Sequence, residues 1–115
     1  MNKINAGEII HHAMIEFAGV TSSIHQFGGT EYKLGKREIG HVHGNFLVDI
    51  PFPMKIRNDI VGRGEAEPHH ILPKSGWVSV HLRNESDIER AITLLEKSYK
   101  LAIEQKAKRI NEKEY

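Results

Sequence analysis

The stretch REIGHVHGNFLVDIP, residues 37–51, decides the fold that we predict for this chain. Two extended runs, Arg37–His43 and Phe46–Ile50, lie on either side of Gly44-Asn45. A pair of turn-forming residues between two extended runs is typical of a β-hairpin. Shorter extended runs precede this stretch and are separated by Gly28-Gly29. The sequence therefore predicts a meander of three or four antiparallel strands.

Helical patterns surround this meander. Apolar residues recur at three- and four-residue spacing near both ends of the chain, as on one face of an amphipathic helix. Ser86 and Glu89 have the spacing of a capping box at the start of the long C-terminal helix. In chain order we expect a helix over Asn5–Phe17, strands within Val20–Phe27 and Tyr32–Leu34, the hairpin, a short helix over Met54–Val61, an ordered loop over Glu65–Gly76, a strand over Trp77–Leu82, and a helix from Ser86 through Ile103.

These elements predict an α+β fold: an antiparallel sheet of four to five strands with helices packed on one face, in the order α-β(3–4)-α-β-α. The length of 115 residues fits a single domain over residues 1–115. We expect its core within about residues 5–104, followed by a charged helical tail over residues 105–115.

The composition limits the classes of partner. Sixteen basic and fifteen acidic side chains leave a net charge of +1, which gives no reason to expect nucleic acid or a membrane surface as a partner. The chain has no cysteine, so disulfides, thiolate metal sites and a cysteine nucleophile are excluded. No apolar run approaches the length of a membrane span or signal peptide, so we expect a cytoplasmic protein. The sequence leaves a homodimer open.

Eight histidines are the unusual feature of the composition, and six lie at positions 25, 41, 43, 69, 70 and 81. Side chains alternate between the two faces of a strand, so residue parity predicts their faces. The predicted apolar face holds Phe46, Val48, Ile50, Val78, Val80 and Leu82. The opposite face collects His41, His43, Asp49, Trp77, Ser79, His81 and Arg83. Parity also places Arg37 and Ile39 on the face of His41.

Two histidines at positions i and i+2 of a strand can reach one point, which suits a metal ion or acid–base chemistry. Asp49 is a candidate third ligand or a carboxylate that orients an imidazole. His69-His70 lies in the loop before the Trp77 strand and is placed to close over the same point. Arg57 and Arg83 are candidates to hold an anionic oxygen. The alternatives at this stage are a metal-free pocket for a small molecule, a divalent metal site, and a non-enzymatic interaction protein with a solvated histidine face.

The order of several motifs resembles a known family. Lys36-Arg37-Glu38-Ile39-Gly40-His41-Val42-His43 is similar to the Arg-Glu-x-x-His-x-His motif of the luciferase-domain family. Pro68-His69-His70, Ser75-Gly76-Trp77 and Arg83-Asn84-Glu85 follow in the family's order. The resemblance runs from about Lys36 to Ala102. This family consists mainly of small bacterial proteins and is similar to the C-terminal part of fungal luciferase, which oxidises a hydroxylated pyrone with molecular oxygen.

The resemblance implies a small-molecule ligand and an oxidation that needs no cofactor. The residues that match the family's motifs are His41, His43, one of His69 or His70, Trp77 and Arg83. Together with the strand faces and the loop position, they lead us to predict His41, His43, His70 and Arg83 as catalytic residues. The substrate-binding residues are Arg37, Asp49, Arg57, His69, Trp77 and His81. A histidine would deprotonate an acidic hydroxyl, and Arg83 would stabilise the resulting anion. The runner-up is a divalent metal site formed by His41, His43, Asp49 and His69.

Overall fold

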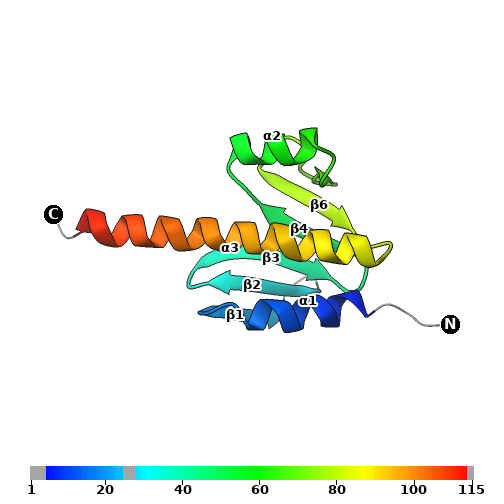
Figure 1. The fold of residues 1–115 in the computed structure, drawn as a ribbon, viewed down its shortest axis with the longest axis horizontal. Coiled ribbons are helices and arrows are strands. Elements are labelled where there is room, and N and C mark those ends of the chain that lie inside the picture. The colour runs from blue at the N-terminus through cyan, green and yellow to red at the C-terminus, as the bar shows by residue number, and fades with distance from the viewer. Residues whose placement is uncertain (1–4, 25–27, 114–115) are drawn as a thin grey trace.

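A computed structural model describes residues 5–24 and 28–113 of the chain (Figure 1). Three helices and six strands follow one another as α1 (Ala6–Ile15), β1 (Val20–Ile24), β2 (Thr30–Leu34), β3 (Arg37–His43), β4 (Leu47–Pro51), α2 (Met54–Gly62), β5 (Glu67–Pro68), β6 (Trp77–His81) and α3 (Glu85–Lys113). The predicted α+β class is confirmed, with six strands in place of four to five. The end of the predicted Val20–Phe27 run, including His25, lies outside the described residues.

The six strands form one antiparallel sheet in the order β1-β2-β3-β4-β6-β5. The hairpin strand β4 lies in the middle, between β3 and β6. Asp49 of β4 pairs with His41 on one side and with Ser79 on the other. This register carries polar side chains from three neighbouring strands to one place on the sheet.

The helices α1 and α3 lie side by side across one face of the sheet, as Figure 1 shows, while α2 packs beside β6. Their apolar sides and the sheet bury a core that includes Ile39, Val48, Ile50, Val78 and Leu95, each fully buried. Gly40 lets α3 approach closely, because a Cβ atom at this position would lie 2.6 Å from Cδ2 of Leu95. The opposite face of the sheet remains for polar residues.

The hairpin turn and the loop before Trp77 differ from the expected pattern. Phe46, predicted in the apolar set of its strand, is 75% exposed and belongs to the hairpin turn, where its N–H donates to the carbonyl of His43. Gly44 has a φ of +55° in this turn, a conformation that costs glycine little. The predicted loop before Trp77 contains a further strand, the short β5, which pairs with β6.

A β-bulge in β3 corrects the predicted faces of that strand. Tyr32 of β2 pairs with Gly40 and Lys33 pairs with Glu38, so Ile39 is an extra residue on the bulged strand. Ile39 is fully buried in the core, not on the face of His41. Glu38 takes its place on the polar face, where its carboxylate contacts His41.

The capping box of α3 lies two residues earlier than predicted. The Asp87 N–H donates to Oδ1 of Asn84 at 3.0 Å, and the Asn84 N–H donates to Oδ2 of Asp87 at 3.2 Å. Ser86 and Glu89 therefore do not form the cap. Within residues 5–24 and 28–113, no helix combines the length and apolar content needed to span a bilayer.

Candidate functional site

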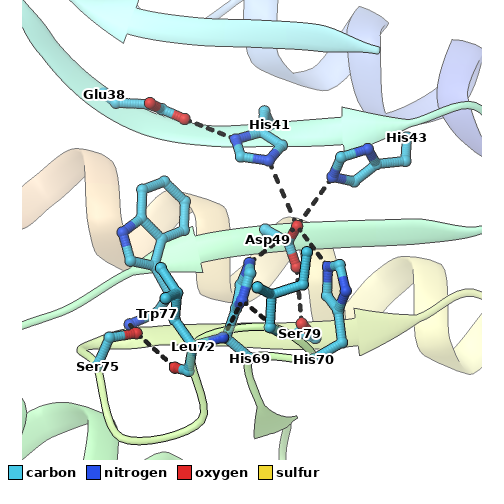
Figure 2. Close-up of polar contacts among 11 residues, drawn as sticks. Glu38, His41, His43, Asp49, His69, His70, Leu72, Ser75, Trp77 and Ser79 are labelled. Atoms are coloured by element: carbon cyan, nitrogen blue, oxygen red, sulfur yellow. Dashed lines mark hydrogen bonds and ion pairs between the residues drawn. The ribbon is translucent and has the colours of Figure 1, made fainter. Parts of the chain in front are cut away.

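Asp49 is the centre of a histidine cluster on the sheet face away from α1 and α3 (Figure 2). Its side chain is 1% exposed, and the Ser79 hydroxyl donates to Oδ1 at 2.7 Å. The other oxygen, Oδ2, faces four imidazoles. The distances from Oδ2 to their Nε2 atoms are 2.8 Å for His43, 3.3 Å for His41, 3.4 Å for His69 and 3.4 Å for His70.

The four histidines reach Asp49 from two kinds of structure. His41 and His43 alternate on β3, directly beside the hairpin partner β4. His69 and His70 lie in the loop that follows β5. His69 organises this loop, because its Nδ1 accepts hydrogen bonds from the backbone N–H groups of Ile71 at 3.1 Å and Leu72 at 3.0 Å.

Glu38 determines which ring nitrogen of His41 carries a proton. Nδ1 of His41 lies 2.7 Å from Oε2 of Glu38, and a carboxylate accepts, so Nδ1 carries the proton. Hydrogen bonds with Asp49 and with Glu38 raise the pKa of His41 to about 9. Nε2 of His41 therefore faces Asp49 either with a proton or with a lone pair available to a metal ion.

His69 has the opposite tautomer. Its Nδ1 is an acceptor for two backbone N–H groups, so the neutral ring must carry its proton on Nε2, which faces Asp49. Burial lowers the pKa of His69, which favours this neutral form. A neutral His69 thus offers an N–H donor toward Asp49, where His41 can offer a lone pair.

Asp49 carries a negative charge at the centre of the cluster. Burial raises the pKa of this carboxyl, but hydrogen bonds with His41, Ser79 and His43 outweigh burial and hold it well below its usual range. A carboxylate oxygen has two lone pairs, whereas four Nε2 atoms lie around Oδ2. Four N–H donors would exceed the capacity of this oxygen, so at least some Nε2 atoms are available for another partner.

Two trios of side chains in the described residues have the spacing of metal ligands: His41, His43 and Asp49, and Asp49, His69 and His70. Within each trio the donor atoms lie within 4.8 Å of one another. The first trio combines two imidazoles and one carboxylate. Three protein ligands of this type leave positions open at a metal for substrate. The cluster could therefore hold a metal ion.

Trp77 forms a wall beside the cluster. Its ring centroid lies 5.3 Å from that of His41 and 6.2 Å from that of His69. Ile71 and Leu72 follow the histidine pair in the loop, and these residues are 71% and 52% exposed. The site thus offers aromatic and apolar surface next to its polar centre.

Four predicted site residues lie away from Asp49. His81 contacts Glu67 at 3.1 Å, and with Arg83 it lines a pocket of about 160 Å³ that Ser79 also borders. His81 pairs with Leu47 in the sheet, while Ser79 occupies the position opposite Asp49. Arg57 holds the loop by donating to the carbonyl of Pro73.

Arg37, the fourth, lines a pocket beneath α3. Of the remaining histidines, His11 contacts the Tyr32 hydroxyl at 2.8 Å and His12 is exposed. Neither reaches the cluster.

Sequence reasoning assigned no role to Glu38 or Ser79. Simple parity placed Glu38 on the wrong face because of the bulge, although its position three residues before His41 was a usable signal. Ser79 was on the predicted polar face, and its contact with Asp49 depends on the pairing of β4 with β6, which the sequence does not reveal.

Fold and site together define a small α+β protein with a buried aspartate encircled by histidines on the face of its sheet that α1 and α3 leave open. A Luciferase domain model matches residues 36–98, more than half of the chain. The protein therefore belongs to the Luciferase domain family, and every residue of the cluster lies inside the matched region. No curated protein and no solved structure matches the chain.

Proposed function

We propose that this protein binds one divalent transition-metal ion through His41, His43 and Asp49, and uses it to oxidise a small molecule with molecular oxygen. The convergence of imidazole Nε2 atoms on Oδ2 of Asp49 is the observation that carries the proposal. A set of two histidines and one carboxylate with open positions is the ligand type of non-haem iron oxygenases.

The distances around Asp49 support this ligand set. Donors about 2.1 Å from a metal lie about 3.4 Å apart in a tetrahedral site and about 3.0 Å apart in an octahedral one. Oδ2 of Asp49 lies 2.8 Å from Nε2 of His43 and 3.3 Å from Nε2 of His41. These distances, which are also hydrogen-bond distances, are close to the ligand-to-ligand spacings of a metal site, so small side-chain shifts would suffice for binding.

The surroundings of the three ligands also suit a metal. Metal-binding histidines commonly donate their other N–H to a carboxylate, which fixes the tautomer. Glu38 has this relation to His41, and the Ser79 hydroxyl holds the remaining oxygen of Asp49. The absence of cysteine leaves nitrogen and oxygen donors, a set that suits iron, zinc, nickel or copper.

His69, His70 and Trp77 would contact the substrate. His69 presents an N–H at Nε2, which can stabilise an anionic oxygen of a bound substrate. His70 is 39% exposed and can exchange a proton with solvent. A planar molecule with an acidic hydroxyl would bind through its oxygen, with its ring against Trp77. Electrons would pass from the substrate anion to oxygen.

Metal analysis of the untagged protein tests the proposal. We expect about one equivalent of metal per chain after reconstitution with Fe²⁺, and loss of this metal in a His41→Ala/His43→Ala double variant. The matched control is His12→Ala/His81→Ala, which removes two histidines outside the cluster and should keep the metal. Oxygen uptake with a hydroxylated pyrone should follow metal content. Equal metal content in the two double variants would refute the ligand assignment.

A metal-free site is the second candidate, and the environment of His41 favours it. Its imidazole lies between the carboxylates of Glu38 and Asp49, and its pKa of about 9 keeps it protonated at neutral pH in the absence of metal. It would then act as an acid and His70 as a base. Full oxygen uptake after complete removal of metal with a chelator would establish this candidate over the first.

A further inference from the structure

A second pocket lies at the other end of β3 from the histidines. The turn between β2 and β3 and the part of α3 that continues past the strands (Figure 1) enclose about 220 Å³. Its lining consists of Leu34, Gly35, Lys36, Arg37, Ala102, Gln105, Lys106 and Arg109. Leu34 and Ala102 are buried and form an apolar floor.

Four of the eight lining residues are cationic and none is acidic. None of Lys36, Arg37, Lys106 and Arg109 forms an ion pair with any described residue. Burial, and to a smaller extent the charge of Arg109, lowers the pKa of Arg37. The cations thus repel one another without compensation from the protein.

Some cations elsewhere on the described surface do have acidic partners. Lys33 pairs with Glu31 at 2.7 Å, and Arg90 pairs with Asp87 at 3.1 Å. The chain as a whole carries a net charge of +1, so four unpaired cations around one cavity are a local concentration. A concave basic site focuses the electrostatic field and attracts an anion.

We propose that this pocket binds a small organic phosphate monoester, with the phosphate held by Arg37 and Arg109 and the apolar part against Leu34 and Ala102. A phosphate dianion offsets more of the four positive charges than a monocarboxylate does. Guanidinium groups also match phosphate oxygens in pairs. The concave shape and apolar floor favour a molecule that enters the cavity over a flat membrane surface.

Binding of phenyl phosphate to the full chain tests the proposal, measured by calorimetry at low salt. We expect an Arg37→Gln/Arg109→Gln variant to bind at least about tenfold more weakly. The control Lys55→Gln/Arg63→Gln removes two exposed cations, one from α2 and one from the residue that follows it, and should bind as the native chain does. The His41→Ala/His43→Ala variant should also bind normally, because the two sites lie at opposite ends of β3. Arg37→Lys/Arg109→Lys should retain more binding than the glutamine variant, and the melting temperature verifies that each variant folds.

Several outcomes would overturn the proposal. Phenyl phosphate binding that is unchanged in the Arg37→Gln/Arg109→Gln variant would exclude this pocket. Equal affinity for benzoate would exclude the preference for a dianion, and equal affinity for inorganic phosphate would exclude the apolar contact. Binding to phosphatidylserine vesicles that phenyl phosphate does not compete would identify the cations as a membrane surface.

Discussion

Two pairs of histidines approach the same carboxylate oxygen, one from a strand and one from a loop. His41 and His43 are held by the register of β3 against β4. His69 and His70 lie in a loop whose conformation depends on His69 itself. Nδ1 of His69 accepts hydrogen bonds from two backbone N–H groups of this loop. The same residue type therefore has different chemistry on the two sides of Asp49.

The difference lies in which ring nitrogen is already engaged. At His41 the carboxylate of Glu38 accepts a hydrogen bond from the protonated Nδ1, so Nε2, which faces Asp49, is the ring nitrogen that a metal ion would contact. At His69 the loop backbone occupies Nδ1, so Nε2 of the neutral ring keeps its proton. His41 and His43, the strand pair, are thus suited to bind a metal ion, and His69 is suited to donate a hydrogen bond.

Asp49 contacts both pairs of histidines, so its replacement should have the largest effect on metal affinity. Asp49→Asn keeps the shape and removes the charge that both pairs share. We expect metal affinity to fall by at least about 100-fold, more than for a typical outer partner of a metal ligand. Competition with a chelator of known affinity measures this, and Asp59→Asn on α2 is the matched control. Metal binding that survives within about tenfold would remove Asp49 from the ligand set.

The same substitution on each side tests the comparison directly. His43→Gln should weaken metal binding by about 100-fold because a ligand is lost, whereas His69→Gln should change it by less than about tenfold. His69→Gln should instead reduce oxygen uptake by the metal-loaded protein. Equal losses of metal in the two variants would show that the loop histidine is a ligand and that the inferred tautomer is wrong.

Replacement of Glu38 should have a smaller effect on metal binding by His41 and His43. Glu38→Gln leaves the three ligands in place but removes the carboxylate that orients His41. We expect about a tenfold loss of metal affinity, at the lower end of the range for outer partners. Glu104→Gln on the exposed side of α3 is the control. An unchanged affinity would mean that the bond between Glu38 and His41 serves the fold alone.

Much of the fold followed from the sequence because its patterns are local. The hairpin turn, the alternation of apolar residues in β4 and β6, and the helical spacing in α1 and α3 each depend on a few neighbouring residues. The bulge at Ile39 could not be predicted, since it depends on how β2 pairs with β3. The cap of α3 was misplaced because Asn84 and Ser86 are both good N-cap residues, and parity and spacing do not choose between them.

The candidate site was predicted in part for the same reason. His41, His43 and Asp49 face one another because adjacent hairpin strands have a simple register. The positions of His69 and His70 depend on a loop in which backbone N–H groups donate to the His69 side chain, and residue types alone do not specify this loop. His81 was assigned to the site by parity, but distance along β6 separates it from Asp49.

The last prediction concerns pH and has the smallest expected effect. In the metal-free protein the pKa of His41 is raised from 6.5 to about 9, so the protonated form is stabilised by folding. Its contribution to the free energy of unfolding is full below about pH 6.5 and is lost as the pH rises through about 9. A metal ion instead requires the deprotonated ring, so stabilisation by metal should grow over the same interval.

The melting temperature of metal-free protein should therefore fall between pH 7 and pH 9, while the increase caused by added metal becomes larger. Among the described carboxyl and imidazole groups with a shifted pKa, His41 is the one that titrates within this interval, because the lowered pKa values of Asp49, Asp87 and His69 act below it. Glu38→Gln removes one of the two hydrogen bonds that raise the pKa of His41, so it should flatten the fall. If added metal raises the melting temperature equally at pH 7 and pH 9, the ion does not compete with the His41 proton, and the strand pair is not its binding site.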